Sequence, residues 1–151
     1  MRNRRGGNAI IETAFMAPWI FFLFVGVFDM GFYAYASICT QNAARAVVLS
    51  AAQTNPYTPP PCTVVIGELT MLPNINPTST TCTGTPVNMT LTTLNGSSCP
   101  DAGYGSANTF ASSPFCIQSA VTYQTIPLIP IPGLLMGQLT LTRTAEMRIL
   151  Q

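Results

Sequence analysis

The chain has 151 residues, of which only 7% are charged and 48% are hydrophobic. Soluble globular domains carry about 25% charged residues, so this composition favours a membrane-embedded segment joined to a neutral polar region. A formal net charge of +1 argues against a nucleic-acid binder, which needs a basic surface to neutralise phosphates. All six basic residues are arginine and histidine is absent. Because histidine is the commonest general base and metal ligand, we expect no enzymatic activity, no cofactor and no metal site.

The first predicted element is one long helix over residues 8–53. Its segment Thr13–Phe28 is apolar and uncharged, and apolar residues continue beyond it, which is enough to cross a bilayer. Residues 37–53 are rich in Ala and contain neither Gly nor Pro, so we expect the helix to continue outside the membrane. It should stop before Asn55-Pro56, because a residue that precedes proline disfavours the α conformation. Pro18 predicts a bend, which membrane helices tolerate.

Charge at the start of the chain predicts the orientation of this helix. Arg2, Arg4 and Arg5 precede the apolar run, and basic flanks stay on the cytoplasmic side of a membrane. We therefore expect a single-pass membrane protein. Its N-terminus would be cytoplasmic, and the remainder would face the periplasm or the outside.

Two carboxylates accompany the apolar run. Glu12 precedes it by one residue and Asp29 lies seventeen positions later, a separation of about 26 Å along a helix. The hydrocarbon core of a bilayer is about 30 Å thick. Both carboxylates are therefore predicted to lie near opposite membrane interfaces.

The segment RNRRGGNAIIE, residues 2–12, resembles the leader of a type IV prepilin: a basic stretch, a glycine, and a glutamate five residues later ahead of an apolar helix. The resemblance implies that a prepilin peptidase cuts between Gly7 and Asn8, which makes residues 1–7 a cytoplasmic leader. It also implies that Glu12 pairs with the N-terminal amine of a neighbouring subunit. A carboxylate close to hydrocarbon needs such a partner. Thr13 departs from the pattern, which often has an aromatic residue there.

Two alternatives to this processing remain open. The helix could be an uncut anchor that presents an envelope assembly or binding module, with Glu12 only marking the cytoplasmic interface. The small residues of Ala34-Tyr35-Ala36 also have the form of a secretory cleavage site before Ser37. Against that site, two carboxylates interrupt the segment, and it is longer than the 7–15 apolar residues of a signal peptide.

The segment AIIETAFMAPWIFFLFVGVFDMG, residues 9–31, resembles the N-terminus of TadE-like proteins of tight-adherence (Flp, type IVc) pilus systems. TQNAARAVVLSAA, which follows, and residues 121–150 at the end of the chain are also similar to that family. The matching positions are Glu12, Pro18, Gly26, Asp29, Gly31, Asn42 and Arg45. Ala46–Leu49 departs from the Glu-Gly-Ala-Arg that often follows the arginine. The resemblance implies a minor pilin or pseudopilin that helps to assemble an adhesive pilus, with other pilins and the assembly platform as partners. It also implies a place in a bacterial inner membrane, with the exported domain in the periplasm or in an extracellular pilus.

The remaining residues predict a small exported domain, so the fold class is α+β. A Pro-rich linker at 54–61 leads into a β-rich domain at 62–151. We expect a β-prone run from Cys62, a strand that ends in an Asn95-Gly96 turn, and strands at 120–125 and 138–149. The last strand alternates, with Leu139, Leu141, Arg143, Ala145 and Met147 on one face. The apolar loop at 127–137 is expected to pack on this domain or to contact a partner subunit.

Five cysteines are present, and no pair has the spacing of a zinc site. The exported region holds Cys62, Cys82, Cys99 and Cys116, which suggests two disulfides. Three pairings are possible. On sequence proximity alone we expect Cys62–Cys82 and Cys99–Cys116. Cys39, near the membrane boundary, is predicted to stay free or to link two subunits.

Overall fold

A computed structural model describes residues 8–53, 62–95, 115–126 and 138–149. Its elements, in chain order, are α1 (Asn8–Gln53), α2 (Cys62–Leu69), β1 (Val87–Asn95), β2 (Phe115–Gln124) and β3 (Thr140–Ile149). This is the α+β fold that was expected, with a long apolar helix and a small antiparallel sheet. The predicted leader 1–7, the Pro-rich linker 54–61 and the apolar loop 127–137 lie outside the described residues.

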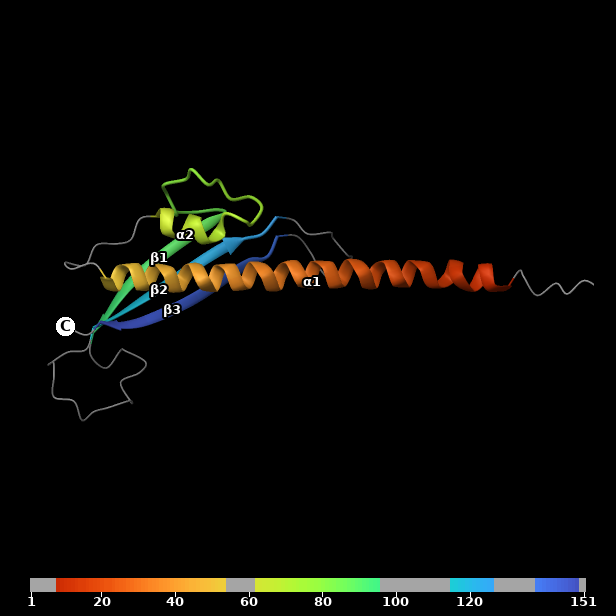
Figure 1. Ribbon diagram of the computed structural model, residues 1–151, viewed down its shortest axis with the longest axis horizontal. Coiled ribbons are helices and arrows are strands. Elements are labelled where there is room, and N and C mark those ends of the chain that lie inside the picture. Colours follow the sequence, from red (N-terminus) through yellow and green to blue (C-terminus); the bar gives the residue numbers. More distant parts are fainter. Residues whose placement is uncertain (1–7, 54–61, 96–114, 127–137, 150–151) are drawn as a thin grey trace, which may run out of the picture.

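The long helix α1 divides into two halves. In the free half, which includes Ala9–Phe24, the side chains are exposed. In the packed half, buried residues recur from Ala36 to Ala51. Figure 1 shows the N-terminal half projecting away from the rest of the molecule, while the C-terminal half crosses one face of the sheet. Pro18 lies inside the helix without ending it, although its ring removes the donor that would bond the carbonyl four residues earlier. The helix has 46 residues, so it is about 69 Å long at 1.5 Å per residue.

The sheet is a three-stranded antiparallel meander in the order β1-β2-β3. The register pairs Tyr123 of β2 with Val87 of β1 and with Leu141 of β3, and all three are buried. The alternation predicted for the last strand is confirmed. Leu141 is buried, whereas the residues that point the other way, Thr140, Thr142, Thr144 and Glu146, are exposed. One face of the sheet therefore packs on helices, and the other is open and rich in threonine.

Small residues on α1 let the sheet approach its backbone closely. Ala36, Ala43 and Ala44 are completely buried, and the buried hydroxyl of Ser119 on β2 donates a hydrogen bond of 2.7 Å to the carbonyl of Ala44. A larger side chain at Ala44 or Ser119 would separate α1 from the sheet. The core between α1 and the sheet is thus set by close backbone approach as much as by large apolar groups.

The run from Cys62 was predicted to be β-prone, and this prediction is wrong, because Cys62–Leu69 forms helix α2. Its buried residues, Cys62, Val65, Ile66 and Leu69, follow the i, i+3, i+4, i+7 spacing of a helix face. They join the core cluster of α1. Packing against α1 therefore overrides the β preference of the branched side chains.

The strand boundaries differ from the prediction, most of all at the start of β2 and after the end of β1. β2 starts at Phe115, five residues earlier than expected, because Phe115–Ser119 finds partners on both neighbouring strands. Asn95 is paired with Phe115, so the connection that follows Asn95 is much longer than a two-residue hairpin turn. Gly96 itself lies outside the described residues.

Candidate functional site: the N-terminal helix

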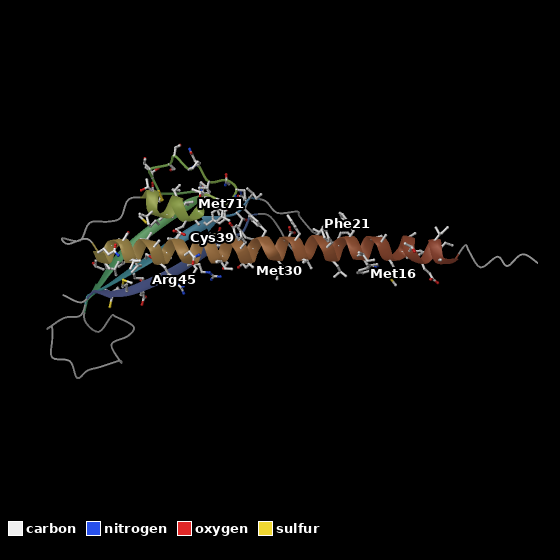
Figure 2. The ribbon with its side chains drawn as sticks, viewed as in Figure 1. Met16, Phe21, Met30, Cys39, Arg45 and Met71 are labelled. Atoms are coloured by element: carbon white, nitrogen blue, oxygen red, sulfur yellow. A yellow bond between two sulfur atoms is a disulfide. The ribbon has the colours of Figure 1, made fainter. Side chains whose placement is uncertain are left out.

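The free half of α1 is apolar over its whole circumference. Every side chain from Ala9 to Phe24 is exposed, including Phe15 at 76% and Trp19 at 74%. A helix that is apolar all round is normally covered, either by a large core or by a membrane. Figure 2 shows the side chains of Met16, Phe21 and Met30 on the part of α1 that extends beyond the sheet.

This half has the length of a bilayer span. The 45 residues Ala9–Gln53 contain a window of mean hydropathy 2.0, of which only 6% is buried. A segment of about 20 residues crosses the hydrocarbon core, and Ala9–Met30 meets that length. By length and composition, α1 is the one described helix that suits a membrane span.

The predicted processing site lies at the beginning of α1. Asn8 is the first helical residue, and Gly7 lies just outside the described residues. Glu12, the fifth residue of the helix, is exposed and makes no ion pair or hydrogen bond within the described part of the chain. Its carboxylate is therefore a single negative charge at the end of an apolar helix.

The second carboxylate is in a different environment. Asp29 is only 2% exposed, and its Oδ2 atom has no hydrogen-bond partner among the described residues. A buried oxygen of this kind carries a desolvation cost of about 1–3 kcal/mol, more when it is charged. The helix holds Asp29 about 26 Å from Glu12, and its place near the outer membrane interface stays a prediction.

The other positions that match the family pattern are spread along α1 rather than gathered at one point. A Cβ atom added at Gly26 or Gly31 would meet no atom of another described segment within 4 Å, so packing among the described residues requires neither glycine. Asn42 and Arg45 are exposed on the packed half of the helix. Figure 2 labels Arg45 on the part of α1 that lies beside the sheet.

Among the cysteines, the structure joins Cys62 to Cys82 in a disulfide with a Cα–Cα distance of 5.5 Å, as expected. Cys39 is free and half-buried. Cys116 is disulfide-bonded, and Cys99, the partner proposed for it, lies outside the described residues. No group of three or more Cys, Asp or Glu side chains that could hold a metal ion occurs in the described ranges.

Sequence reasoning missed the polar contacts between α1 and the sheet, among them one made by an arginine. Arg143 on β3 faces α1, and its guanidinium donates hydrogen bonds to the Ser37 hydroxyl, with 3.1 Å between Nε and Oγ. The signal was visible in the sequence, since Arg143 interrupts the apolar face of an alternating strand. An arginine at such a position indicates a polar partner on the opposing layer.

Comparison with known protein families gives a match to the N-terminal part of the chain. A family model described as TadE-like protein matches residues 7–49, which include Glu12, the apolar half of α1 and the Asn42–Arg45 segment. No curated protein and no solved structure matches the chain. Residues 7–49 are thus similar to TadE-like proteins, and the apolar half of α1 suits an anchor in a membrane.

Proposed function

Residues 7–49 of this chain are a TadE-like segment, and from this premise we propose that the protein is a minor pilin or pseudopilin that takes part in assembling a tight-adherence pilus. Its role is structural and non-catalytic. The observation that carries the proposal is the division of α1 into an exposed apolar half and a half packed against a sheet. Such a helix anchors a domain in the membrane, and its exposed apolar surface can pack against the helices of neighbouring subunits.

The orientation follows from charge. Arg2, Arg4 and Arg5 retain the N-terminus in the cytoplasm, so the sheet and α2 are exported from the inner membrane. The Cys62–Cys82 disulfide supports export, because disulfides persist in oxidising compartments such as the periplasm.

In this proposal, a prepilin peptidase cuts the bond between Gly7 and Asn8 on the cytoplasmic side. The cut frees an α-amine at the first residue of α1, and Glu12 of one subunit pairs with that amine on a neighbour. Near hydrocarbon an unpaired charge is costly. Mutual neutralisation of the two groups therefore favours side-by-side docking of helices before the assembly platform adds the subunit to the fibre.

The processing step is tested by mass spectrometry of the mature protein. We expect the native chain to begin at Asn8, and Gly7→Leu to retain the leader because a branched side chain obstructs the peptidase. Gly6→Ala is the matched control and should still be cut. A native N-terminus at Met1 would favour an uncut anchor, and one at Ser37 would favour a secreted domain.

The assembly step is tested with Glu12→Gln and Glu12→Ala. Both variants keep the apolar run and the flanking arginines, so we expect wild-type membrane insertion and at least partial cleavage. Both should be lost from the fraction that co-purifies with sheared pili. Wild-type recovery with pili would contradict a role for Glu12 in assembly.

A further inference from the structure

A cavity of about 150 Å³ lies between α2, the turns that follow it and the start of β1. A single water needs only about 10–15 Å³, and pockets for drug-sized ligands begin at about 300 Å³. The cavity therefore has room for one small ring. Figure 1 shows the segment between α2 and β1 arching over α2 on the side away from α1, so this cavity is separate from the membrane anchor.

The lining of the cavity is polar but uncharged. Its polar side chains all come from the segment between α2 and β1: Asn74, Asn76, Ser79, Thr81, Thr83 and Thr85. Apolar side chains complete it, among them Ile66 of α2 and Val87 of β1, which are both buried. None of the described residues that line the cavity is charged or aromatic. A charged ligand that leaves water needs an opposite charge, so this lining favours a neutral ligand over a phosphate, a carboxylate or a metal ion.

Four of the polar side chains are free to bind a ligand. Asn74, Thr81, Thr83 and Thr85 are exposed, and their side chains make no hydrogen bond within the described part of the chain. A threonine hydroxyl donates one hydrogen bond and also accepts, and the asparagine amide does both through separate atoms. A ligand that satisfies this set must itself donate and accept at several neighbouring positions, as a molecule with several hydroxyl groups does.

Contacts with the core hold the walls of the cavity in place. The Cys62–Cys82 disulfide ties the segment to the start of α2. The hydroxyl of Tyr123, from β2, donates a hydrogen bond of 2.8 Å to the carbonyl of Pro73, directly before Asn74. A wall that is already ordered lowers the entropy cost of binding. This makes a small ligand sufficient, although it offers few contacts.

The edge of β1 beside the cavity disfavours a peptide ligand. An extended peptide binds a sheet edge through free backbone groups. Here the amide of Met89 already donates a hydrogen bond of 2.9 Å to the carbonyl of Cys82, so the chain itself occupies this position of the edge. Side-chain hydroxyls and the Asn74 amide, rather than a free strand edge, are what the cavity offers.

We propose that this cavity binds a single neutral sugar residue. The sugar hydroxyls exchange hydrogen bonds with Asn74, Thr81, Thr83 and Thr85, and the C–H groups of the ring pack on the aliphatic side chains of the lining. Binding is weak, in the millimolar range, because no aromatic ring among the described lining residues stacks on the sugar. The site goes beyond pilus assembly, and neither property requires the other.

The test is a titration of the ¹⁵N-labelled full chain in dodecylphosphocholine micelles, since that detergent carries no sugar. The probes are the methyl glycosides of glucose, galactose, mannose and N-acetylglucosamine, and the readout is the position of the backbone amide signals. With at least one sugar we expect saturable shifts at Asn74, Thr83 and Val87. The amide of Thr142, on the open face of the sheet, should not move.

Variants then assign the binding to the hydroxyls of the cavity. Thr83→Val keeps the shape of the side chain but removes the hydroxyl. It should weaken binding about tenfold, which corresponds to about 1.4 kcal/mol, whereas Thr83→Ser should retain most of the affinity. Thr90→Val is the matched control, because Thr90 is exposed on β1 and does not line the cavity. Unchanged amide signals of β2 and β3 confirm that each variant keeps its fold.

Two further probes test the selectivity for neutral sugars: sodium phosphate and the peptide acetyl-Gly-Ser-Gly-amide. Neither should give saturable shifts. The proposal is overturned if none of the four glycosides gives saturable shifts at the cavity, or if phosphate or the peptide binds there as tightly as the best sugar. An affinity that Thr83→Val leaves unchanged also overturns it, because the sugar would then not be held by these hydroxyls.

Failure of this inference is distinguishable from failure of the proposed function. Sugar binding by a chain whose native N-terminus is Met1 would contradict the pilin proposal alone. A chain that is cut before Asn8 and co-purifies with pili, but binds none of the sugars, would contradict the cavity proposal alone.

Discussion

Removal of the Cys62–Cys82 disulfide is expected to destabilise the exported domain by a magnitude that follows from the loop it closes. The two cysteines are separated by 20 positions in sequence. Restricting a loop of that length in the unfolded chain stabilises the native state by about 3.3 kcal/mol at 25 °C. The variant Cys62→Ala/Cys82→Ala loses this contribution. For a chain of this size each kcal/mol corresponds to about 2–4 °C, so the unfolding midpoint should fall by roughly 7–13 °C.

The assay is denaturation of the full chain in detergent micelles, followed through the near-ultraviolet signal of its tyrosines. That signal reports on the domain core, because Tyr123 is completely buried between the sheet and the helices. Cys39→Ala is the matched control, since that thiol is free, and its midpoint should stay close to that of the wild type. A loss of less than about 1 kcal/mol in the double variant would refute the reasoning, because it would show that the loop is already ordered without the cross-link.

Three further variants probe the packing, each read by the same denaturation assay. Ser119→Val should lower the free energy of unfolding by about 2 kcal/mol, because it removes the hydrogen bond to Ala44 and adds a methyl group where α1 and the sheet touch. Wild-type stability would show that α1 and the sheet can separate to accommodate the larger side chain. Leu69→Ala, at a fully buried position on α2, should cost about 2–5 kcal/mol, and a loss below 1 kcal/mol would mean that α2 adds little to the core. Tyr123→Phe should cost about 1 kcal/mol through the lost 2.8 Å bond to the carbonyl of Pro73. Burial raises the pKa of Tyr123 above its ordinary value of 10.0, so the wild type should lose stability as the pH rises through that value, whereas the Phe variant should lack this loss.

The long helix was predictable because several local signals agree. An apolar run, an Ala-rich continuation and the stop before Asn55-Pro56 all favour one helix, and α1 indeed spans Asn8–Gln53. The alternating strand at the end of the chain was predictable for the same reason, since period-two patterning and β propensity coincide in it.

The remaining features depend on contacts between segments far apart in sequence. In α2 the β-branched Thr63, Val64, Val65 and Ile66 favour a strand locally, yet packing on α1 makes this segment a helix. The start of β2 depends on partners in β1 and β3 that no local pattern identifies. The burial of Asp29 was equally hidden, because the sequence places it on a helix but says nothing of which side is covered.

The unbroken course of α1 from the apolar half into the sheet has a mechanical consequence. Each residue turns a helix by about 100° and lengthens it by 1.5 Å, so the number of residues between Asp29 and Ala36 fixes the rotational phase of the domain relative to its anchor. One inserted residue would rotate the domain by more than a quarter turn about the axis of α1. Seven would return it to within about 20° of its original direction and raise it by about 10.5 Å. The number of residues in this part of α1 therefore fixes both the height of the domain above the bilayer and the direction in which its threonine-rich face points.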